Sequence, residues 1–420
     1  MSDPKRRVLL VAQLAPPSPL IAARRVAGLA KYLPDERLEV SVLTSRISGE
    51  GEIEGARTVA RTGDLMATPL NWRRAQFKAL EGSADGSYSK PSRLESVLVP
   101  DIAAATWLPF AVTRTLRLVR ESGVDCVITT GPAHSVHLVG LALRRRGISW
   151  IAEFRDGWTF DQPARGFPLR VQRQLDASLE RRVATGADAL VAVTQPIADD
   201  LSRRFDRPAT VLTNAFDPDE VTGGGDNGLL DPDRFSVVHT GRMAYAGRSP
   251  VPLLDALRAL KRDHPRVAER LEVVLAGPLS VEEEPLVRAA ELSGTVRAVG
   301  TLDRPSTLRL QQAADALVVL AEGSSRRVAT GKLFEYLATD APILVLGDDS
   351  EAARIVAETG AGFATSGSDS NLIASALERL VAAPSEHPRD RAAMEPYSYP
   401  HVARRYAALI EDVVSRRERS

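Results

Sequence analysis

The stretch Thr330-Gly331-Lys332-Leu333-Phe334-Glu335-Tyr336-Leu337 follows the apolar run Ala316–Leu320, which predicts a buried strand. Small residues open the stretch, and the pattern after them predicts the start of a helix. The first N–H groups of a helix have no partner within it, so a strand followed by a small-residue turn and a helix start predicts an anion site. These residues therefore indicate a strand-to-helix unit of an α/β fold with an anion site at its junction.

Lys332 and Glu335 lie three residues apart, and this spacing puts them on one face of a helix. Lys332 brings a positive charge to the expected anion site, and Glu335 brings acceptor oxygens of the kind that bind ribose hydroxyls. Phosphate and ribose together indicate a nucleotide. The same residues also fit a plain amphipathic helix with an ion pair worth roughly a few tenths of a kcal/mol, so the rest of the chain has to decide.

Length and charge limit the classes of protein that fit. The chain has 420 residues, which suggests two or three domains, and 54 basic residues balance 54 acidic ones. A net charge of zero argues against a general polyanion binder, so we expect no nucleic-acid partner. Cys126 is the only cysteine and lies in an apolar run. A buried, inert thiol is expected, and a disulfide framework or multi-cysteine zinc site is excluded.

The apolar run Val8–Val11 is too short for a secretory signal, and no apolar run reaches the length of about 20 residues that spans a bilayer. We therefore expect a cytoplasmic protein. Peripheral contact with the inner face of the membrane stays open, although solvated helix ends explain the relevant arginines more simply. The arginines that could form such a basic face are Arg24, Arg25, Arg144, Arg145 and Arg146.

Short apolar runs alternate with helical patterns through the first half of the chain. The runs predicted as strands are Val8–Val11, Val40–Leu43, Cys126–Ile128, Trp150–Ala152, Ala189–Val193 and Thr210–Leu212. The predicted helices between them include Ile21–Leu33, Ala105–Arg120, Ser135–Arg145 and Leu169–Thr185. Such alternation predicts a parallel sheet covered on both faces. The polar segment Ser45–Lys90 is expected to form loop and short helix.

Turn-forming residues between Asp217 and Gly228 interrupt this pattern, which then restarts. The later predicted strands are Phe235–Val238, Leu271–Leu275, Val296–Val299, Ala316–Leu320 and Ile343–Leu346, with helices at Pro250–Lys261, Val281–Leu292, Leu308–Ala314 and Ala352–Glu358. We predict two Rossmann-like βα domains facing across a cleft. Their expected ranges are residues 1–217 and 233–396, with a linker at 218–232.

A last helix is expected within residues 397–420. Its apolar positions recur at helical spacing, at Val402, Tyr406, Ile410 and Val413. We hypothesise that this helix returns to the first domain.

Two arginines and two glycines follow the first strand of the second domain, in the segment from Thr240 to Arg248. Glycine lets the backbone approach a ligand closely, and an arginine fork matches phosphate oxygens. Arg242, Arg248 and Lys332 all lie after strands of one domain, so they can converge on one diphosphate. Neither G-x-G-x-x-G nor G-x-x-x-x-G-K-[ST] occurs at these positions, so NAD chemistry and ATP hydrolysis lose support.

Charged residues also follow a strand of the first domain, in Glu153-Phe154-Arg155-Asp156-Gly157-Trp158. They are expected at the mouth of the cleft, although a salt-bridged turn fits equally. His134 and His137 lie at a strand-to-helix junction, where catalytic groups often sit and where capping or surface histidines are also common. No H-E-x-x-H, carboxylate cluster or G-x-S-x-G occurs, so neither a bound metal nor a serine hydrolase is expected.

These segments, in this order, resemble the GT-B-fold glycosyltransferases, most closely the retaining enzymes of glycosyltransferase family 4. The resemblance covers nearly the whole chain, and the Phe-Arg-Asp-x-Trp block and the stretch from Thr330 to Leu337 are its most specific parts. The other segments that carry it are Ala23–Ala30, Leu212–Asp217, Thr240–Arg242 with Arg248, and Gly300–Leu302.

The resemblance implies transfer of a sugar from a nucleoside-diphosphate-sugar donor to an acceptor hydroxyl, with retention at the anomeric carbon and without a metal or further cofactor. Arg242 and Arg248 would bind the diphosphate, Lys332 the phosphate or sugar, and Glu335 the ribose. The expected donor-binding residues are Gly241, Arg242, Arg248, Gly300, Leu302, Gly331, Lys332, Leu333 and Glu335. The acceptor, a saccharide, lipid-linked saccharide or secondary metabolite, would lie near the expected catalytic residues Arg155, Asp156 and His134.

The chain departs from the family pattern at several positions. The family often has a glutamate eight residues before Glu335, where this chain has Arg327, and its glycine-rich first loop is here the stiffer Pro16–Pro19. Asn214-Ala215 replaces the usual Asn-Gly, and no histidine aligns with the common catalytic position. Two other functions stay open: a nucleotide-sugar epimerase on the same fold, and a catalytically degenerate partner subunit.

Overall fold

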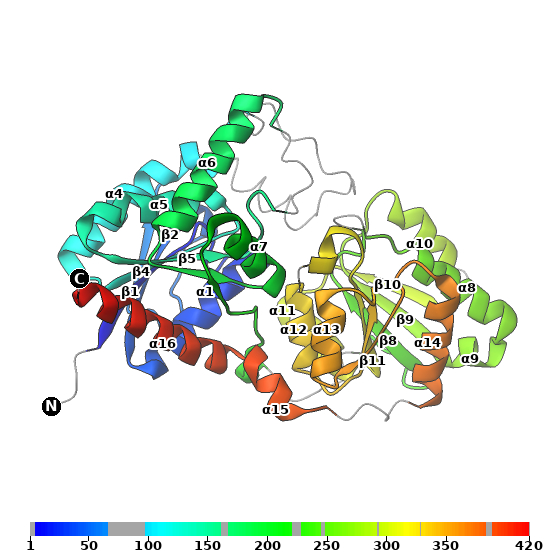
Figure 1. The fold of residues 1–420 in the computed structure, drawn as a ribbon. Helices are drawn as coiled ribbons and strands as arrows, with labels where there is room; N and C mark the ends of the chain where they lie inside the picture. Colours follow the sequence, from blue (N-terminus) through cyan, green and yellow to red (C-terminus); the bar gives the residue numbers. More distant parts are fainter. Residues whose placement is uncertain are drawn as a thin grey trace. The chain divides into compact units, whose positions relative to one another are not determined.

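The structure, a computed structural model, describes residues 5–65, 97–160, 167–220, 228–244, 248–291, 294–327, 329–383 and 389–419. It contains two compact units. The described residues up to Asn214 form the first unit together with those from Tyr399 onward, and the described residues of Ala215–Ser398 form the second unit. Each unit contains a parallel sheet with helices on both faces (Figure 1). The predicted fold class of two Rossmann-like α/β domains is confirmed.

The first unit contains a seven-stranded sheet in the order β3-β2-β1-β4-β5-β6-β7. Its strands are β1 (Arg6–Val11), β2 (Leu38–Ser45), β3 (Thr58–Thr62), β4 (Cys126–Thr130), β5 (Ser149–Phe154), β6 (Ala189–Ala192) and β7 (Ala209–Val211). Its α-helices are α1 (Ile21–Tyr32), α3 (Ala103–Thr106), α4 (Leu108–Ser122), α5 (His137–Leu143), α6 (Arg170–Gly186), α7 (Gln195–Phe205) and α16 (Tyr399–Glu418). Cys126 is buried, as its apolar run predicts, and burial raises the pKa of its thiol.

The second unit contains a six-stranded sheet in the order β10-β9-β8-β11-β12-β13. Its strands are β8 (Phe235–Thr240), β9 (Leu271–Ala276), β10 (Val296–Gly300), β11 (Ala316–Leu320), β12 (Ile343–Leu346) and β13 (Gly362–Thr365). Its α-helices are α8 (Val251–Asp263), α9 (Pro265–Arg270), α10 (Glu283–Glu291), α11 (Arg304–Ala313), α12 (Gly331–Leu337), α13 (Glu351–Glu358), α14 (Ser370–Ala382) and α15 (Arg391–Met394).

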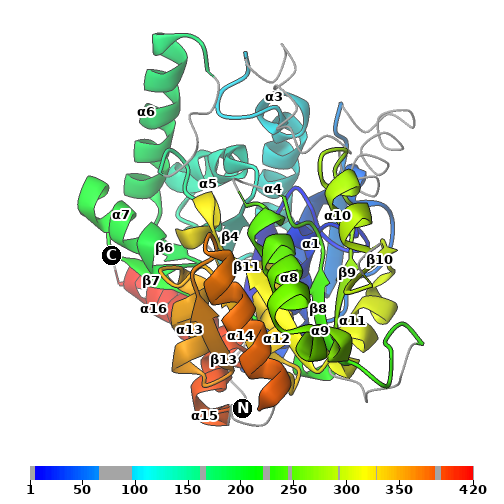
Figure 2. The same ribbon diagram turned by 90° about the vertical axis from the view of Figure 1, so that its right-hand side faces the viewer.

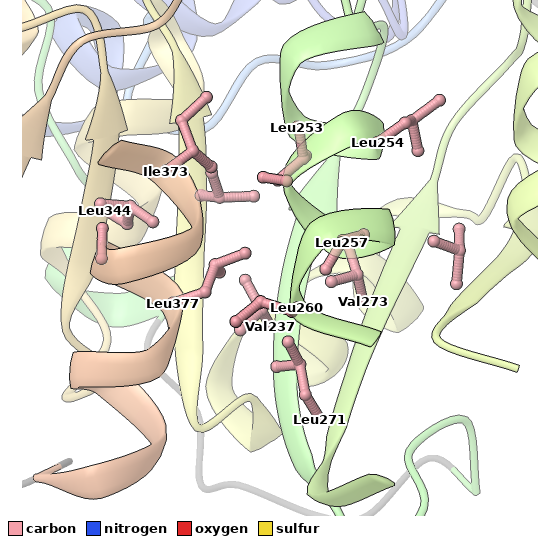
Figure 3. Close-up of a cluster of buried hydrophobic side chains, with 14 of the residues drawn as sticks. Val237, Leu253, Leu254, Leu257, Leu260, Leu271, Val273, Leu344, Ile373 and Leu377 are labelled. Carbon is pink, nitrogen blue, oxygen red and sulfur yellow. The ribbon is translucent and has the colours of Figure 1, made fainter. Parts of the chain in front are cut away.

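Alternating residues of the second sheet supply two separate cores. Val318 packs beneath α8 and α14, which lie side by side on one face of the sheet (Figures 2 and 3). The neighbouring Val319 points to the opposite face and packs against α11, α12 and α13. Because both faces are covered, successive strand residues are all apolar. This arrangement fixes α12, which carries Lys332 and Glu335, against the sheet.

The two strands missing from the predictions both lie at sheet edges. β3 falls in the segment expected to form loop and short helix, and β13 was not predicted. Both are partly exposed, and their sequences, Thr-Val-Ala-Arg-Thr and Gly-Phe-Ala-Thr, lack a continuous apolar run. An edge strand has one neighbouring strand and needs fewer apolar residues, so the run that identifies a central strand is missing. Residues 66–90 of that polar segment lie outside the described ranges.

The last helix, α16, belongs to the first unit, which confirms the hypothesis that it returns there. The four apolar positions expected to face the core are all buried, at Val402, Tyr406, Ile410 and Val413. Tyr399 lies against α1 so closely that a Cβ on Gly28 would come within 2.4 Å of the tyrosine ring. Gly28 therefore permits the two helices to touch. Within the described ranges, no helix is long and apolar enough to cross a membrane.

Candidate functional site

The strand order of the second sheet reverses at β8, which has β9 on one side and β11 on the other. In open α/β sheets, ligands bind outside the carboxyl ends of the strands at such a reversal. The segment Gly241–Arg242 follows β8 at this edge. The helix α12, which begins at Gly331, follows β11. The Thr330–Leu337 stretch and the Thr-Gly-Arg segment therefore both lie at the edge where a ligand is expected.

Lys332 is the centre of this site. Its Nζ lies 3.1 Å from Nε2 of His239 and 3.5 Å from the carbonyl oxygen of Arg242. Gly241 has a φ of 87°, and a Cβ there would approach the Lys332 Nζ to 3.2 Å. Glycine thus permits the left-handed backbone and leaves space beside the amine.

His239 is fully buried at the end of β8 and determines how Lys332 is held. Its Nδ1 lies 2.9 Å from the carbonyl oxygen of Val318 in β11. A carbonyl only accepts, so the closer contact assigns the proton of the neutral ring to Nδ1. Nε2 lies 3.1 Å from the Lys332 amine, from which it accepts, and 3.3 Å from the Arg242 carbonyl oxygen, which also faces that amine. Burial, followed by the positive charge of Lys332, lowers the pKa of His239 well below its ordinary value, which keeps the ring neutral.

The same surroundings disfavour the charge on Lys332. Burial lowers the pKa of Lys332 well below its ordinary value, and the charge of Arg248 lowers it further. The Arg248 side chain lies at the end of β11, with Nη1 3.5 Å from the Leu320 carbonyl oxygen. Two cationic groups thus share one partly enclosed region. An anion bound there would relieve their repulsion.

The side-chain hydroxyl of Thr330, at the start of α12, lies in the same part of the site without a partner among the described residues. The Thr330 Oγ1 atom is buried and accepts or donates no hydrogen bond within the described residues. Buried hydroxyls normally have a hydrogen-bond partner, because a buried polar group without one costs roughly 1–3 kcal/mol. A ligand oxygen at the carboxyl end of β11 would satisfy it.

Glu335 is held by two donors. Arg304 Nη1 donates to its Oε1 at 3.0 Å, and Gln311 Nε2 donates to its Oε2 at 3.1 Å. Gln311 is fully buried and also donates to Thr240 Oγ1 at 2.9 Å, so it links Glu335 to the end of β8. The Oε1 atom of Gln311 has no hydrogen-bond partner among the described residues. The carboxylate therefore has a fixed orientation.

The remaining predicted donor-binding residues differ in what they could offer a ligand. Gly300 ends β10 with a φ of 72°, and Leu302 packs on the core beside α12. Arg304 follows them directly and reaches Glu335, which brings this loop to the carboxylate. Leu333 is fully buried in the core, so only its backbone is available to a ligand, and its N–H donates to the Thr330 carbonyl at 3.0 Å.

In the first unit, the predicted catalytic histidine is part of an aromatic stack. His134 is 3% exposed and stacks on Trp158 with ring centroids 5.0 Å apart. His137 stacks on Phe154 at 5.0 Å, and its Nδ1 lies 2.9 Å from Thr129 Oγ1. Burial lowers the pKa of His137 to about 3. The aromatic residues of the Phe-Arg-Asp-x-Trp block thus pack against both histidines.

Arg155 has a structural role in this unit. Its Nη1 donates to the carbonyl oxygens of Ala22 at 2.7 Å and Gly131 at 3.0 Å, which ties α1 to the end of β4. Burial lowers the pKa of Arg155. Asp156 follows at the carboxyl end of β5 and is half-buried. Arg155, Asp156 and His134 therefore lie at one edge of the first sheet.

Arg25 does not belong to a basic surface, which corrects the expectation for this one of the arginines listed above. It is fully buried and bonds Glu153 Oε1 through Nε at 3.1 Å and Nη2 at 2.7 Å. Tyr406 of α16 donates to the same oxygen at 2.6 Å, and Thr130 donates to Oε2. Burial alone would raise the pKa of Glu153, but the charge of Arg25 holds it below its ordinary value. This network joins α1, β4, β5 and α16.

Three residues of the second-unit site were not singled out from the sequence: His239, Arg304 and Gln311. His239 stands directly before the Thr-Gly-Arg segment, and a histidine within an apolar strand is the one signal that could have drawn attention to it. Arg304 and Gln311 carry no local signal. Among the described residues, no group of three or more His, Cys, Asp and Glu side chains has an arrangement that could hold a metal ion.

Comparison with known proteins places these features in context. Residues 22–215 match a family model described as the glycosyl transferase 4-like domain. No curated protein matches the sequence. The fold is similar to that of sucrose-phosphate synthase from Thermosynechococcus elongatus, with 17% identity, a TM-score of 0.61, and coverage of 99% of this chain and 98% of that one.

Two further solved structures share the fold. A putative UDP-N-acetylglucosamine 2-epimerase from Listeria monocytogenes has 17% identity and a TM-score of 0.60, covering 99% of this chain and 98% of that one. Anabaena HepE, solved in complex with UDP-glucose, has 14% identity and a TM-score of 0.55, covering 98% of each chain. At these identities the likeness concerns the fold alone.

Proposed function

We propose that this chain is a glycosyltransferase that uses a nucleoside-diphosphate-sugar donor and retains the anomeric configuration. Residues 22–215 match the glycosyl transferase 4-like domain, and the whole chain has the GT-B fold. One observation carries the donor assignment: Lys332 and Arg248 lie together at the strand reversal of the second sheet, and the charge of Arg248 lowers the pKa of Lys332. A bound diphosphate would bring negative charge beside Lys332 and so favour its protonated form. HepE, which shares the fold, was solved with UDP-glucose.

We assign the donor's parts by the groups that meet them. Arg242 and Arg248 bind the diphosphate, with the Gly241 and Gly331 backbone close to it. Lys332 binds the phosphate or the sugar. A leaving diphosphate gains negative charge in the transition state, and cations already in place stabilise that charge without reorganising. In this proposal the cations do the work of a metal, and neither metal nor further cofactor is required.

Glu335 accepts from the ribose hydroxyls. Arg304 and Gln311 already hold its two oxygens in place, and each carboxylate oxygen has capacity for a further hydrogen bond. The backbone of Gly300–Leu302, which Arg304 brings to Glu335, contacts the base. The acceptor hydroxyl approaches from the first domain, near Asp156, Arg155 and His134. A saccharide, a lipid-linked saccharide and a small metabolite are the acceptor classes to test.

A thermal-shift panel tests the donor assignment. UDP, GDP, ADP and dTDP, with their common sugar conjugates, are added without metal and with EDTA. A ligand at about 100 times its Kd adds about 2.7 kcal/mol of stability, which is readily measured. One clear hit supports the site, and its loss in Lys332→Ala locates the binding there. Absence of any hit would argue against the donor assignment and favour a degenerate partner subunit.

Product analysis separates the remaining alternatives. Incubation of the matching nucleotide sugar with an acceptor should release nucleoside diphosphate and give a product with the donor's anomeric configuration by NMR. Conversion of the nucleotide sugar to an epimer without any acceptor would instead show that the protein is a nucleotide-sugar epimerase. Binding of the donor without either reaction would indicate a degenerate subunit.

A further inference from the structure

The N-terminal half of α6 carries an exposed apolar surface that the proposed reaction does not use. Leu169 is 57% exposed, Val171 65% and Leu175 50%. Val171 and Leu175 lie four residues apart, so they share one face of the helix. Val97 is 62% exposed, and its carbonyl accepts from Gln172 Nε2 at 3.1 Å, which holds it beside the first turn. Together, Val97, Leu169, Val171 and Leu175 form the α6 patch.

Among the described residues, the exposed charges on α6 all have one sign. The exposed charged side chains of α6 are arginines, at Arg170, Arg173, Arg181 and Arg182. The helix has two acids, and both are buried and already bound. Asp176 accepts from Trp158 Nε1 at 2.7 Å, and Glu180 accepts from Arg204 Nη2 at 2.7 Å. Within the part of the chain that the structure describes, α6 itself therefore presents apolar and positive groups and no exposed negative one.

This combination selects among possible occupants. We propose that the α6 patch and its arginines bind the surface of an anionic lipid bilayer. Apolar side chains enter the boundary between head groups and acyl chains, while arginines bind the phosphates above it. A second copy of the chain is a poorer occupant, because a symmetric contact would place these arginines against one another. Single exposed apolar residues need no explanation, but a cluster at one helix end does.

The position of α6 in the fold places the α6 patch near the proposed acceptor side. The helix follows β5 in a parallel sheet, so its first turn lies at the carboxyl edge of that sheet, where Arg155, Asp156 and His134 also lie. A bilayer bound there would bring a lipid-linked acceptor to the proposed acceptor side. That last step rests on the proposed function, whereas bilayer binding itself does not.

Vesicle co-sedimentation of the full chain tests the proposal. The probes are vesicles of phosphatidylcholine alone and of equal parts phosphatidylcholine and phosphatidylglycerol. We expect binding to the anionic vesicles only, weakening as salt is added. Arg170→Gln with Arg182→Gln should weaken it by about fivefold for each arginine, and Val171→Ser with Leu175→Ser by at least about tenfold. Leu372→Ser is the matched control, since Leu372 is equally exposed at 50% on α14 and should have no effect.

Failure of the wild-type chain to bind anionic vesicles, or equal binding by the Val171→Ser, Leu175→Ser variant, would overturn the proposal. Sedimentation velocity is measured in parallel, and a dimer that this variant dissociates would assign the patch to a second copy instead. Nucleotide thermal shifts should be the same in every variant. A variant that binds vesicles poorly but keeps its thermal shift with nucleotide supports bilayer binding by the α6 patch. This result does not depend on which reaction the proposed site performs.

Discussion

Arg25 in the first unit is a fully buried cation and Lys332 in the second is a half-buried one, and their surroundings differ. Arg25 has a carboxylate partner in Glu153, and Thr130 and Tyr406 satisfy the remaining capacity of that carboxylate. Within the described residues, Lys332 instead contacts a neutral histidine ring and a carbonyl, and Arg248 adds a second positive charge. The first arrangement is complete without a ligand, and the second is not.

This difference separates a structural charge from a functional one. A buried ion pair whose hydrogen bonds are all made leaves nothing for a substrate to bind. A cation that lacks a counterion lowers the stability of the protein, and that cost is recovered when an anion binds. Burial of charge therefore does not by itself identify a site, whereas burial without a compensating charge does.

Removing the carboxylate should give the largest effect. Glu153→Ala leaves Arg25 buried without a counterion, and breaking such a pair costs about 3–5 kcal/mol. Urea denaturation measures the loss. Glu411→Ala is the control, because Glu411 pairs with Arg6 at the surface with its side chain 56% exposed, and such a pair is worth about 0–1 kcal/mol. Similar losses of stability in both variants would show that the buried Arg25–Glu153 pair stabilises the protein no more than a surface ion pair does.

Removing the uncompensated cation should act in the opposite direction. Lys332→Met should raise the Tm of the unliganded protein, because a lysine whose folded pKa is depressed costs stability wherever the unfolded chain is protonated. The same change should weaken nucleoside-diphosphate binding by about 1.5–3 kcal/mol. Calorimetry measures both quantities, with Lys261→Met on the exposed end of α8 as control. Unchanged affinity would remove Lys332 from the phosphate site.

A smaller effect should follow from releasing Glu335. Gln311→Leu keeps the carboxylate but removes one donor that orients it, so affinity for the nucleoside diphosphate should fall by about 0.5–1.5 kcal/mol. Comparison with the 2′-deoxy analogue makes the test specific. The wild type should distinguish the two ligands more strongly than the variant does. Equal discrimination by both proteins would mean that Gln311 does not act through the ribose.

The smallest effect is a proton taken up on binding. The pKa of Lys332 is depressed in the free protein, and a bound diphosphate raises it, so the complex holds more protons than the free protein at a pH between the two values. Affinity should therefore rise as the pH is lowered toward the free pKa and level off below it. Calorimetry in buffers of different ionisation enthalpy detects the proton. Lys332→Met should remove the uptake, which separates it from titration of the nucleotide's own phosphate.

Central strands and edge strands differ in how well the sequence predicts them. Central strands such as β11 are identified by their continuous apolar runs, and Lys332 stands out because a charged residue follows a small-residue turn. The edge strands β3 and β13 have no such run. Helix α16 was assigned to the first unit only as a hypothesis, because amphipathic spacing shows that a helix is packed but not against what.

Long-range partners account for the other differences. His239 acquires its role from Val318, which is 79 residues away and becomes its neighbour only when β8 pairs with β11. Arg25 looked like a surface charge because its partner, Glu153, is 128 residues away. A pattern of local residues identifies positions where a ligand is expected, but the partner of a buried charge depends on which strands and helices come together.

Because α16 follows Ala215–Ser398 in the chain but completes the first unit, the second unit is inserted within the first. During synthesis on the ribosome, residues up to Asn214 emerge early but remain without Tyr406, which donates to the Glu153 carboxylate. The second unit emerges whole and can finish folding first. The paired segments at Phe216 and Tyr397, joined by an N–H···O bond of 2.9 Å, then bring the end of the chain back. The first unit is therefore synthesised mostly before the second unit but is completed after it.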